Sequence, residues 1–132
     1  MKQITHEWIN SSKSDLELVK KVIADENLTH LAAFHCQQAL EKGLKAILEE
    51  YSDEVPKIHN IATLLSRVSP YIKLDYDYTL VKTLDQLYIE ARYPGGLGLL
   101  PDGKPSLQEL RELFDFTVRI TTDIIDKLNK KT

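Results

Sequence analysis

Side chains that could bind an anionic ligand gather at two places in the chain. The first is a polar stripe whose members recur every three or four positions: Gln38, Glu41, Lys42 and Lys45. On a helix this spacing places the four side chains within one arc of roughly 100°. The stripe has two interpretations. It is either a solvated face with a local Glu41–Lys45 ion pair, or a polar groove for a nucleotide or a partner protein.

The second place is the end of a predicted helix, where Arg92 and Tyr93 precede a proline. Tyr88 lies one helical turn before Arg92, and Asp85 lies two turns before it on nearly the same face. An arginine held between an aromatic ring and a carboxylate presents a fixed guanidinium, which suits bidentate binding of phosphate or carboxylate. Alternatively, Arg92 only satisfies helix-terminal carbonyl groups and stacks on Tyr88.

The histidines and the single cysteine do not form a recognisable catalytic or metal-binding pattern. Because His30 and His35 are five residues apart and no Glu-x-x-His pair occurs, we expect no metal site. His59 follows a proline-bounded turn and either bonds backbone groups at a helix start or lies in a cleft. Cys36 is adjacent to His35, but neighbouring helix positions diverge by about 100°, so we expect a buried and unreactive thiol.

The composition fits one globular domain over residues 1–132. Hydrophobic residues make up 42% of the chain and charged residues 28%, with a formal net charge of −3. These values exclude a disordered chain and do not favour general binding to phosphate backbones. A single cysteine excludes an intramolecular disulfide. No apolar run reaches the roughly 20 residues that span a bilayer and no signal sequence is visible, so we expect a cytoplasmic protein without membrane contact.

Apolar residues recur at intervals of three and four, which predicts helices over 5–24, 29–51, 58–68 and 77–92. A last helix begins at a capping box formed by Ser106 and Glu109, and Thr29 is the expected N-cap of the second helix. Most of the glycines and prolines lie in 93–105, which predicts a long loop. The fold predicted is all-α: an antiparallel up-and-down bundle of four long helices plus one short helix.

The second predicted helix also carries a family resemblance. Residues 37–46, with the sequence QQALEKGLKA, resemble the Q-Q-A-x-E-K-x-L-K-A core of the HEPN (higher eukaryotes and prokaryotes nucleotide-binding) family. Three further pieces, around Trp8, 59–61 and 91–94, fit the family in the same order. The resemblance implies a helical bundle that commonly dimerises. It also implies frequent association with a minimal nucleotidyltransferase, and many of these relatives are ribonucleases, including toxins of toxin–antitoxin pairs.

The ribonuclease members carry an arginine followed four to six residues later by a histidine, and this pattern is missing here. The positions four to six after Arg92 are Gly96, Leu97 and Gly98, none of which can exchange a proton. We therefore expect a nucleotide-binding or partner-binding module with no catalytic residues, metal or cofactor. Its expected binding residues are Gln38, Lys42, Lys45, His59, Arg92 and Tyr93.

Two alternatives to the binding module remain open at this point. The chain could be a metal-independent, toxin-like ribonuclease with an altered site, in which His35 or His59 acts with Arg92. It could also be a dimerising scaffold without a small ligand. The expected partners are a second copy of the chain, a minimal nucleotidyltransferase, and a nucleotide or RNA ligand.

Overall fold

The computed structural model describes residues 1–91 and 104–131, and over these residues the chain forms five helices and no strand. The helices are α1 (Gln3–Val22), α2 (Thr29–Tyr51), α3 (Ile61–Val68), α4 (Tyr78–Ala91) and α5 (Leu107–Lys131). The all-α class and the set of four long helices plus one short helix are confirmed. The predicted loop over 93–105 and the end of the fourth helix at residue 92 fall largely outside the described residues.

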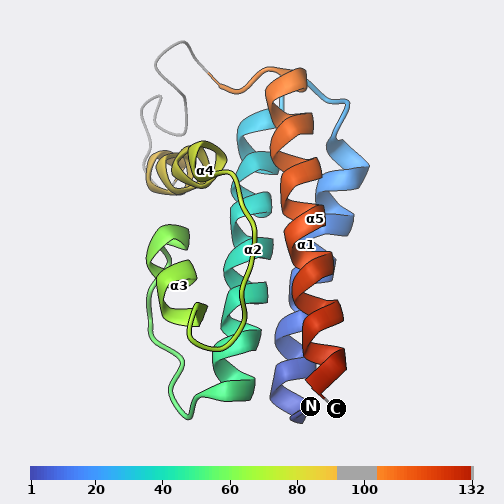
Figure 1. Cartoon of the computed structure of the whole chain (residues 1–132). Coiled ribbons are helices and arrows are strands. Elements are labelled where there is room, and N and C mark those ends of the chain that lie inside the picture. The colour runs from blue at the N-terminus through green and yellow to red at the C-terminus, as the bar shows by residue number, and fades with distance from the viewer. Residues whose placement is uncertain (92–103, 132) are drawn as a thin grey trace.

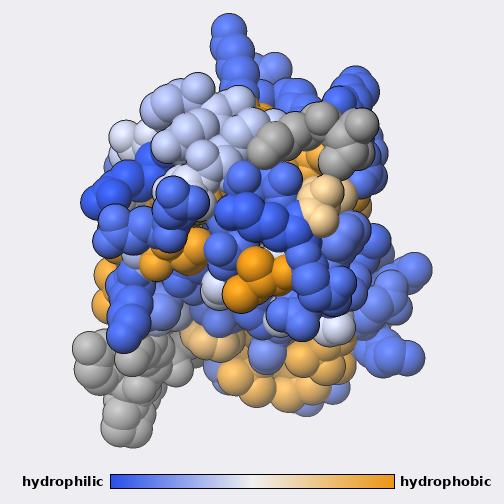
Figure 2. Space-filling model, turned by 90° about the horizontal axis from the view of Figure 1, so that it is seen from below, coloured by the Kyte–Doolittle hydropathy of each residue, from blue (hydrophilic) through white to orange (hydrophobic). Residues whose placement is uncertain are grey.

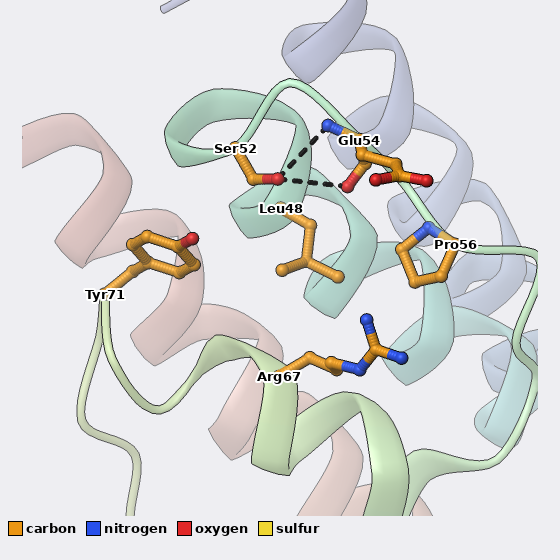
Figure 3. Close-up of a pocket in the computed structure, with 6 residues that line it drawn as sticks. All are labelled: Leu48, Ser52, Glu54, Pro56, Arg67 and Tyr71. Atoms are coloured by element: carbon orange, nitrogen blue, oxygen red, sulfur yellow. Dashed lines mark hydrogen bonds between the residues drawn. The ribbon is translucent and has the colours of Figure 1, made fainter.

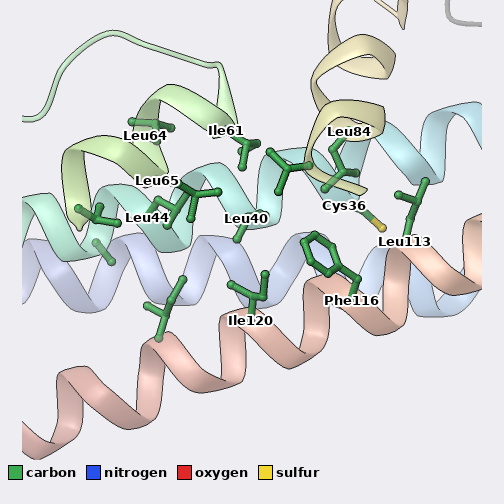
Figure 4. Packing of buried hydrophobic residues seen from close by; sticks show 14 of the residues in the cluster. Cys36, Leu40, Leu44, Ile61, Leu64, Leu65, Leu84, Leu113, Phe116 and Ile120 are labelled. Carbon is green, nitrogen blue, oxygen red and sulfur yellow. The ribbon is translucent and has the colours of Figure 1, made fainter. Parts of the chain in front are cut away.

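Three of the long helices, α1, α2 and α5, lie side by side along the long axis of the molecule (Figure 1). Helix α1 runs opposite to α2 and α5, and both chain termini lie at the same end. The short helix α3 and helix α4 lie on the other side of α2, and α4 crosses the direction of the long helices (Figures 1 and 4). Helix α2 contacts all four other helices and is therefore the centre of the fold.

The central place of α2 explains its unusual burial. Of its 23 residues, 14 are buried, whereas a helix on a protein surface buries only one face. Its apolar side chains interleave with those of the surrounding helices (Figure 4). The largest fully buried side chains are Leu40, Leu44, Ile47, Ile61, Leu64, Leu84, Leu87, Leu110, Leu113, Ile120, Ile124 and Leu128. A core drawn from all five helices fixes the surface of α2 that remains accessible.

Small residues let α1 and α5 approach α2 closely near its middle. The Ser12 hydroxyl on α1 donates a 2.6 Å hydrogen bond to the Ala39 carbonyl of α2. Where α2 meets α5, a Cβ atom added to Gly43 would lie 3.3 Å from Cδ1 of Ile124 and 3.7 Å from Cγ2 of Thr121. Glycine is therefore used at position 43 for space between packed helices.

Local side chains cap some of the helices but not α1 or α2, and one of the two predicted caps is wrong. Ser106 and Glu109 form the expected capping box, with reciprocal hydrogen bonds of 3.0 Å. Thr29 is not an N-cap, because α2 already begins there and Leu28 holds the cap position without a side-chain bond. The Thr29 hydroxyl is buried and has no hydrogen-bond partner among the described residues.

Two predicted helix bounds shift for similar local reasons. Helix α1 covers Gln3–Val22 rather than 5–24, and an Asp25 side chain accepts the Asn27 amide in the turn that follows. Helix α3 begins at Ile61 rather than at 58, because the Asn60 side chain accepts the backbone amide of Thr63 and caps the helix there. Residues 58 and 59 thus lie before α3, in the connection from α2.

Candidate functional site

The polar stripe of Gln38, Glu41, Lys42 and Lys45 lies on α2, as predicted, but the first of its two interpretations, a solvated face, is wrong. Glu41 and Lys45 are each only 5% exposed, and the other two members are half-buried. Periodicity along a single helix cannot reveal this burial, since α1 covers one edge of the stripe and the segment before α3 covers the other. The stripe is a partly enclosed network of ionisable side chains.

Glu41 is the acceptor at the centre of this network. Its Oε2 atom receives a 3.0 Å bond from Nζ of Lys45, which confirms the predicted local ion pair. The same carboxylate lies 3.1 Å from Nδ1 of His59. Nζ of Lys45 also lies 5.9 Å from the centre of the Trp8 ring on α1. Burial of an ion pair is favourable only when both groups keep further partners, and here both do.

Asp15 on α1 plays the same part at the other edge of the stripe. Its two carboxylate oxygens contact Nδ1 of His35 at 3.0 Å and Nζ of Lys42 at 2.7 Å. Because an ionised carboxylate can only accept hydrogen bonds, Nδ1 of His35 carries the proton in this contact. The same reasoning applies to His59 beside Glu41. In the neutral form of either ring, Nε2 is then an acceptor, and both side chains are partly exposed, 33% for His35 and 48% for His59.

The rings of Phe34 and Tyr88 connect these two histidines. We call the resulting series of four rings the ring row: His35, Phe34, Tyr88 and His59. The rings of His35 and Phe34 meet edge to face at 5.5 Å. Tyr88 on α4 is stacked on Phe34 at 5.7 Å and on His59 at 5.4 Å. Aromatic faces of this kind are the surfaces on which nucleobases stack. The ring row therefore combines stacking surfaces with two oriented imidazoles.

The two glutamines of the family motif serve the structure of the site. The Gln37 amide donates a 2.7 Å bond to the carbonyl of His59 and accepts a 2.8 Å bond from the amide of Gln38. Gln37 is fully buried, so these partners satisfy an amide that would otherwise destabilise the core. They also fix the backbone at His59, which positions that imidazole over Glu41. His59 bonds a carboxylate rather than the backbone groups considered as an alternative.

Asp85, the carboxylate expected beside Arg92, accepts two backbone amide groups at the start of α3. Its two oxygens accept the backbone amides of Ile61 at 2.7 Å and Ala62 at 3.1 Å, so the side chain caps α3. Burial raises the pKa of Asp85 above its ordinary value; the two amide bonds act in the opposite direction, and Glu41 adds to the rise. Arg92 and Tyr93 lie outside the described residues.

The charges on this surface nearly cancel. With both imidazoles neutral, the carboxylates of Asp15 and Glu41 balance the ammonium groups of Lys42 and Lys45, so the stripe carries no excess positive charge. The two lysines expected to bind an anion are thus held by internal partners. Hydrogen bonds and stacking, rather than net charge, are what this part of the surface offers to a ligand.

Three further observations concern the cysteine, possible metal ligands and possible membrane spans. Cys36 is fully buried, and this burial raises the pKa of its thiol to about 12, although a hydrogen bond with Thr117 acts in the opposite direction. The expectation that the thiol is buried is confirmed. Within residues 1–91 and 104–131, no three histidine, cysteine or acidic side chains are grouped so that they could hold a metal ion. In the same ranges, no helix has the length and apolar character to cross a membrane.

Sequence spacing located Lys42, Lys45 and Gln38, and it singled out Tyr88 only as a neighbour of Arg92; it did not place the residues that complete the site beside the stripe. Asp15, Phe34 and Tyr88 come from α1, α2 and α4, and no short-range pattern links them. One signal was available for Phe34, since it precedes the stripe by one helical turn and shares its face. For Asp15 and Tyr88, only the packing of whole helices brings the side chains to the stripe.

Comparison with known families agrees with this fold. The family model of the HEPN domain matches residues 5–128, nearly the whole chain. The chain belongs to the HEPN family. No curated protein matches this HEPN sequence.

Two solved structures share the HEPN fold seen here. TT1696 from Thermus thermophilus is 22% identical, with a TM-score of 0.72, and the match covers 93% of this chain and 97% of that one. ST0689, an archaeal HEPN homologue, is 23% identical, with a TM-score of 0.68 and coverage of 96% and 98%. At this level of identity the similarity establishes the fold alone.

Proposed function

We propose that this HEPN chain is a nucleotide-binding module that forms a homodimer and acts beside a nucleotidyltransferase partner. The observation that carries the ligand part is the ring row, where the stacked pair of Tyr88 and His59 reaches the surface next to the polar stripe. His59 is fixed by Glu41 and by the stacking contact, so its Nε2 atom has a defined direction. A fixed acceptor beside a stacking surface suits recognition of a nucleobase edge.

The phosphate contact of this proposal falls to Arg92, because the lysines of the stripe are already paired with Asp15 and Glu41. Arg92 follows the last residue of α4, the helix that also carries Tyr88. A guanidinium binds phosphate through two parallel hydrogen bonds, which a paired ammonium group cannot do. Base binding and phosphate binding are therefore assigned to different residues and can be tested separately.

Calorimetric titration with the four nucleoside monophosphates and the matching nucleosides tests the ligand part. Replacing Tyr88 by leucine removes the stacking surface and should weaken binding of both ligand forms by about tenfold or more, since base stacking contributes roughly 1–3 kcal/mol. Tyr78→Leu is the matched control, because Tyr78 lies on the same helix and is 58% exposed. Arg92→Gln should reduce nucleotide affinity to that of the nucleoside. The absence of binding at millimolar ligand would reject this part of the proposal.

The partner part rests on membership of the HEPN family and is tested by coexpression. If a small nucleotidyltransferase reading frame lies next to the gene, its product should elute with this chain in size-exclusion chromatography. Sedimentation of the chain alone at micromolar concentration should give a dimer. A monomer that also fails to bind the nucleotidyltransferase would reject both expectations while leaving the nucleotide experiment intact.

A second candidate function, metal-independent RNA cleavage, is favoured by one observation. Both His35 and His59 are oriented through Nδ1 by a carboxylate, as in general-base sites, and Nε2 is left as the proton acceptor. In this alternative, one imidazole removes the proton of the ribose 2′-hydroxyl, and the 2′-oxygen attacks the adjacent phosphorus to form a 2′,3′-cyclic phosphate. The P–O5′ bond breaks, the leaving 5′-oxygen takes up a proton from the second imidazole or from water, and Arg92 stabilises the charge on the phosphate. Cleavage of a labelled RNA should then fall by at least about a hundredfold in His59→Gln or His35→Gln. Activity that persists in both variants and in Arg92→Ala would reject the ribonuclease.

A further inference from the structure

A separate pocket lies towards the C-terminal end of α2, outside the ring row and the polar stripe. Its volume is about 240 Å³, which is below the roughly 300–1,000 Å³ of pockets for drug-sized ligands and restricts it to a smaller molecule. Figure 3 shows its side chains arranged around Leu48, with Arg67 of α3 on one side and the connection after α2 on the other. The lining residues are Leu48, Ser52, Glu54, Pro56, Arg67 and Tyr71.

The walls of this pocket are held by contacts within the chain. The Ser52 hydroxyl accepts the amide of Glu54 and donates to its carbonyl, both at 3.1 Å, so the turn after α2 has a defined shape. The ring of Tyr71 is stacked on Tyr51 at 5.7 Å. Leu48 is only 3% exposed and closes the pocket from beneath, while most of the lining is polar. The pocket therefore exists before any ligand enters.

Two opposite charges line the pocket without pairing with each other. The Arg67 guanidinium and the Glu54 carboxylate form no hydrogen bond or ion pair with any side chain or backbone group of the described ranges, 1–91 and 104–131. Arg67 is directed into the pocket below Leu48, while Glu54 lies on the opposite side (Figure 3). A ligand that satisfies both groups must carry a negative and a positive group of its own.

We propose that this pocket binds a small zwitterion of the amino-acid class, one with a carboxylate, an ammonium group and an apolar body. The ligand carboxylate accepts two hydrogen bonds from Arg67, the geometry for which a guanidinium is suited. Its ammonium group donates to Glu54. Its apolar part rests on Leu48 and between the rings of Pro56 and Tyr71. A simple anion would leave Glu54 unpaired and adds repulsion, so the pair of charges favours the zwitterion.

Titration with L-leucine, followed by backbone amide signals of residues 52–55 and 67 in NMR spectra, tests this proposal. Two analogues remove one charge each: L-leucinamide lacks the carboxylate, and N-acetyl-L-leucine lacks the ammonium group. Leucine should bind with a dissociation constant of about 1 mM or tighter, and each analogue should bind at least about tenfold more weakly. The absence of localised shifts at about 10 mM leucine, or equal binding of all three compounds, would overturn the proposal.

Variants assign the two charges. Arg67→Gln and Glu54→Gln should each weaken leucine binding by at least about tenfold, and Glu54→Gln should bind leucine and N-acetyl-leucine equally. The matched controls are Arg111→Gln and Glu112→Gln, because both side chains are exposed on α5, outside the pocket. All four substitutions are at exposed positions and should leave the melting temperature of the protein unchanged. Leucine binding that survives in Arg67→Gln would overturn the assignment, and a nucleotide titration of the same variant keeps this site distinct from the ring row.

Discussion

Nδ1 of His59 lies 3.1 Å from Oε2 of Glu41, a residue 18 positions earlier in the chain. The exposed imidazole is thereby bonded to one of the most buried charged groups of the protein, which in turn is paired with Lys45. The orientation of a surface side chain thus depends on an interior ion pair. Substitution of either buried partner should affect stability and His59 together.

Glu41→Gln should lower the free energy of unfolding by roughly 3–5 kcal/mol, because it leaves the ammonium group of Lys45 buried without a counterion. Urea denaturation measures this loss. The matched control is Asp123→Asn, which breaks another pair at i, i+4 spacing, with Lys127, but at a position where the acid is 41% exposed. That change should cost less than about 1 kcal/mol. The double variant Glu41→Gln/Lys45→Met should be more stable than Glu41→Gln. Equal losses of unfolding free energy in Glu41→Gln and Asp123→Asn would contradict the prediction.

The capping carboxylate of Asp85 should make stability depend on pH. Burial raises the pKa of Asp85 in the folded protein, so between the unfolded value near 3.9 and the folded value the folded state binds more protons. The contribution of this group to stability is therefore greatest below the unfolded pKa and falls as pH rises through the folded pKa.

The test compares wild type with Asp85→Asn by urea denaturation from neutral pH down to about pH 4. Relative to this variant, the wild type should gain stability as the pH is lowered. Ser106→Ala removes a cap at an exposed helix start and is the control, since no carboxyl group is changed. A difference between wild type and Asp85→Asn that stays constant with pH would show that Asp85 has the same pKa in both states.

The thiol of Cys36 should be unreactive in the folded protein. Its pKa of about 12 leaves almost no thiolate at pH 8, and the side chain is fully buried. Labelling by a thiol reagent should therefore occur only through unfolding and should accelerate in urea. A variant that carries Cys36→Ser together with Ser66→Cys places the thiol at an exposed position of α3 and gives the reference rate. Equal rates in the two folded proteins would contradict the prediction.

Gly43 should tolerate a methyl group but not a branched side chain. Alanine gains roughly 0.5–1 kcal/mol of helix propensity, which offsets the 3.3 Å contact of its Cβ with the end of Ile124, so the net change should stay below about 1 kcal/mol. Gly43→Val adds two further carbons between α2 and α5 and should destabilise the fold by roughly 1–3 kcal/mol. Urea denaturation of both variants decides this, and equal stability of the two would be inconsistent with close packing at position 43.

The extent of what the sequence predicts is clear from α2. Its bounds follow from apolar spacing, since the spacing predicts a helix over 29–51 and Thr29–Tyr51 is observed. The burial of Glu41 and Lys45 does not follow from the spacing, because an amphipathic interpretation assumes one buried face while α2 is covered by four helices. In the same way, spacing places Lys42 on the stripe but does not predict Asp15, its partner from a different helix.

Glu41 both orients His59 and pairs with Lys45 in the interior, which has a consequence for how relatives of this protein can diverge. Substitutions are least costly to stability at the rim of the stripe, at positions such as His59 and Lys42, where side chains reach solvent. The same change attempted at Glu41 or Lys45 would disturb the packing of the molecule itself. Variation in specificity among homologues should accordingly concentrate at the rim while the inner pair is retained, which gives a simple criterion for choosing positions in an engineering library.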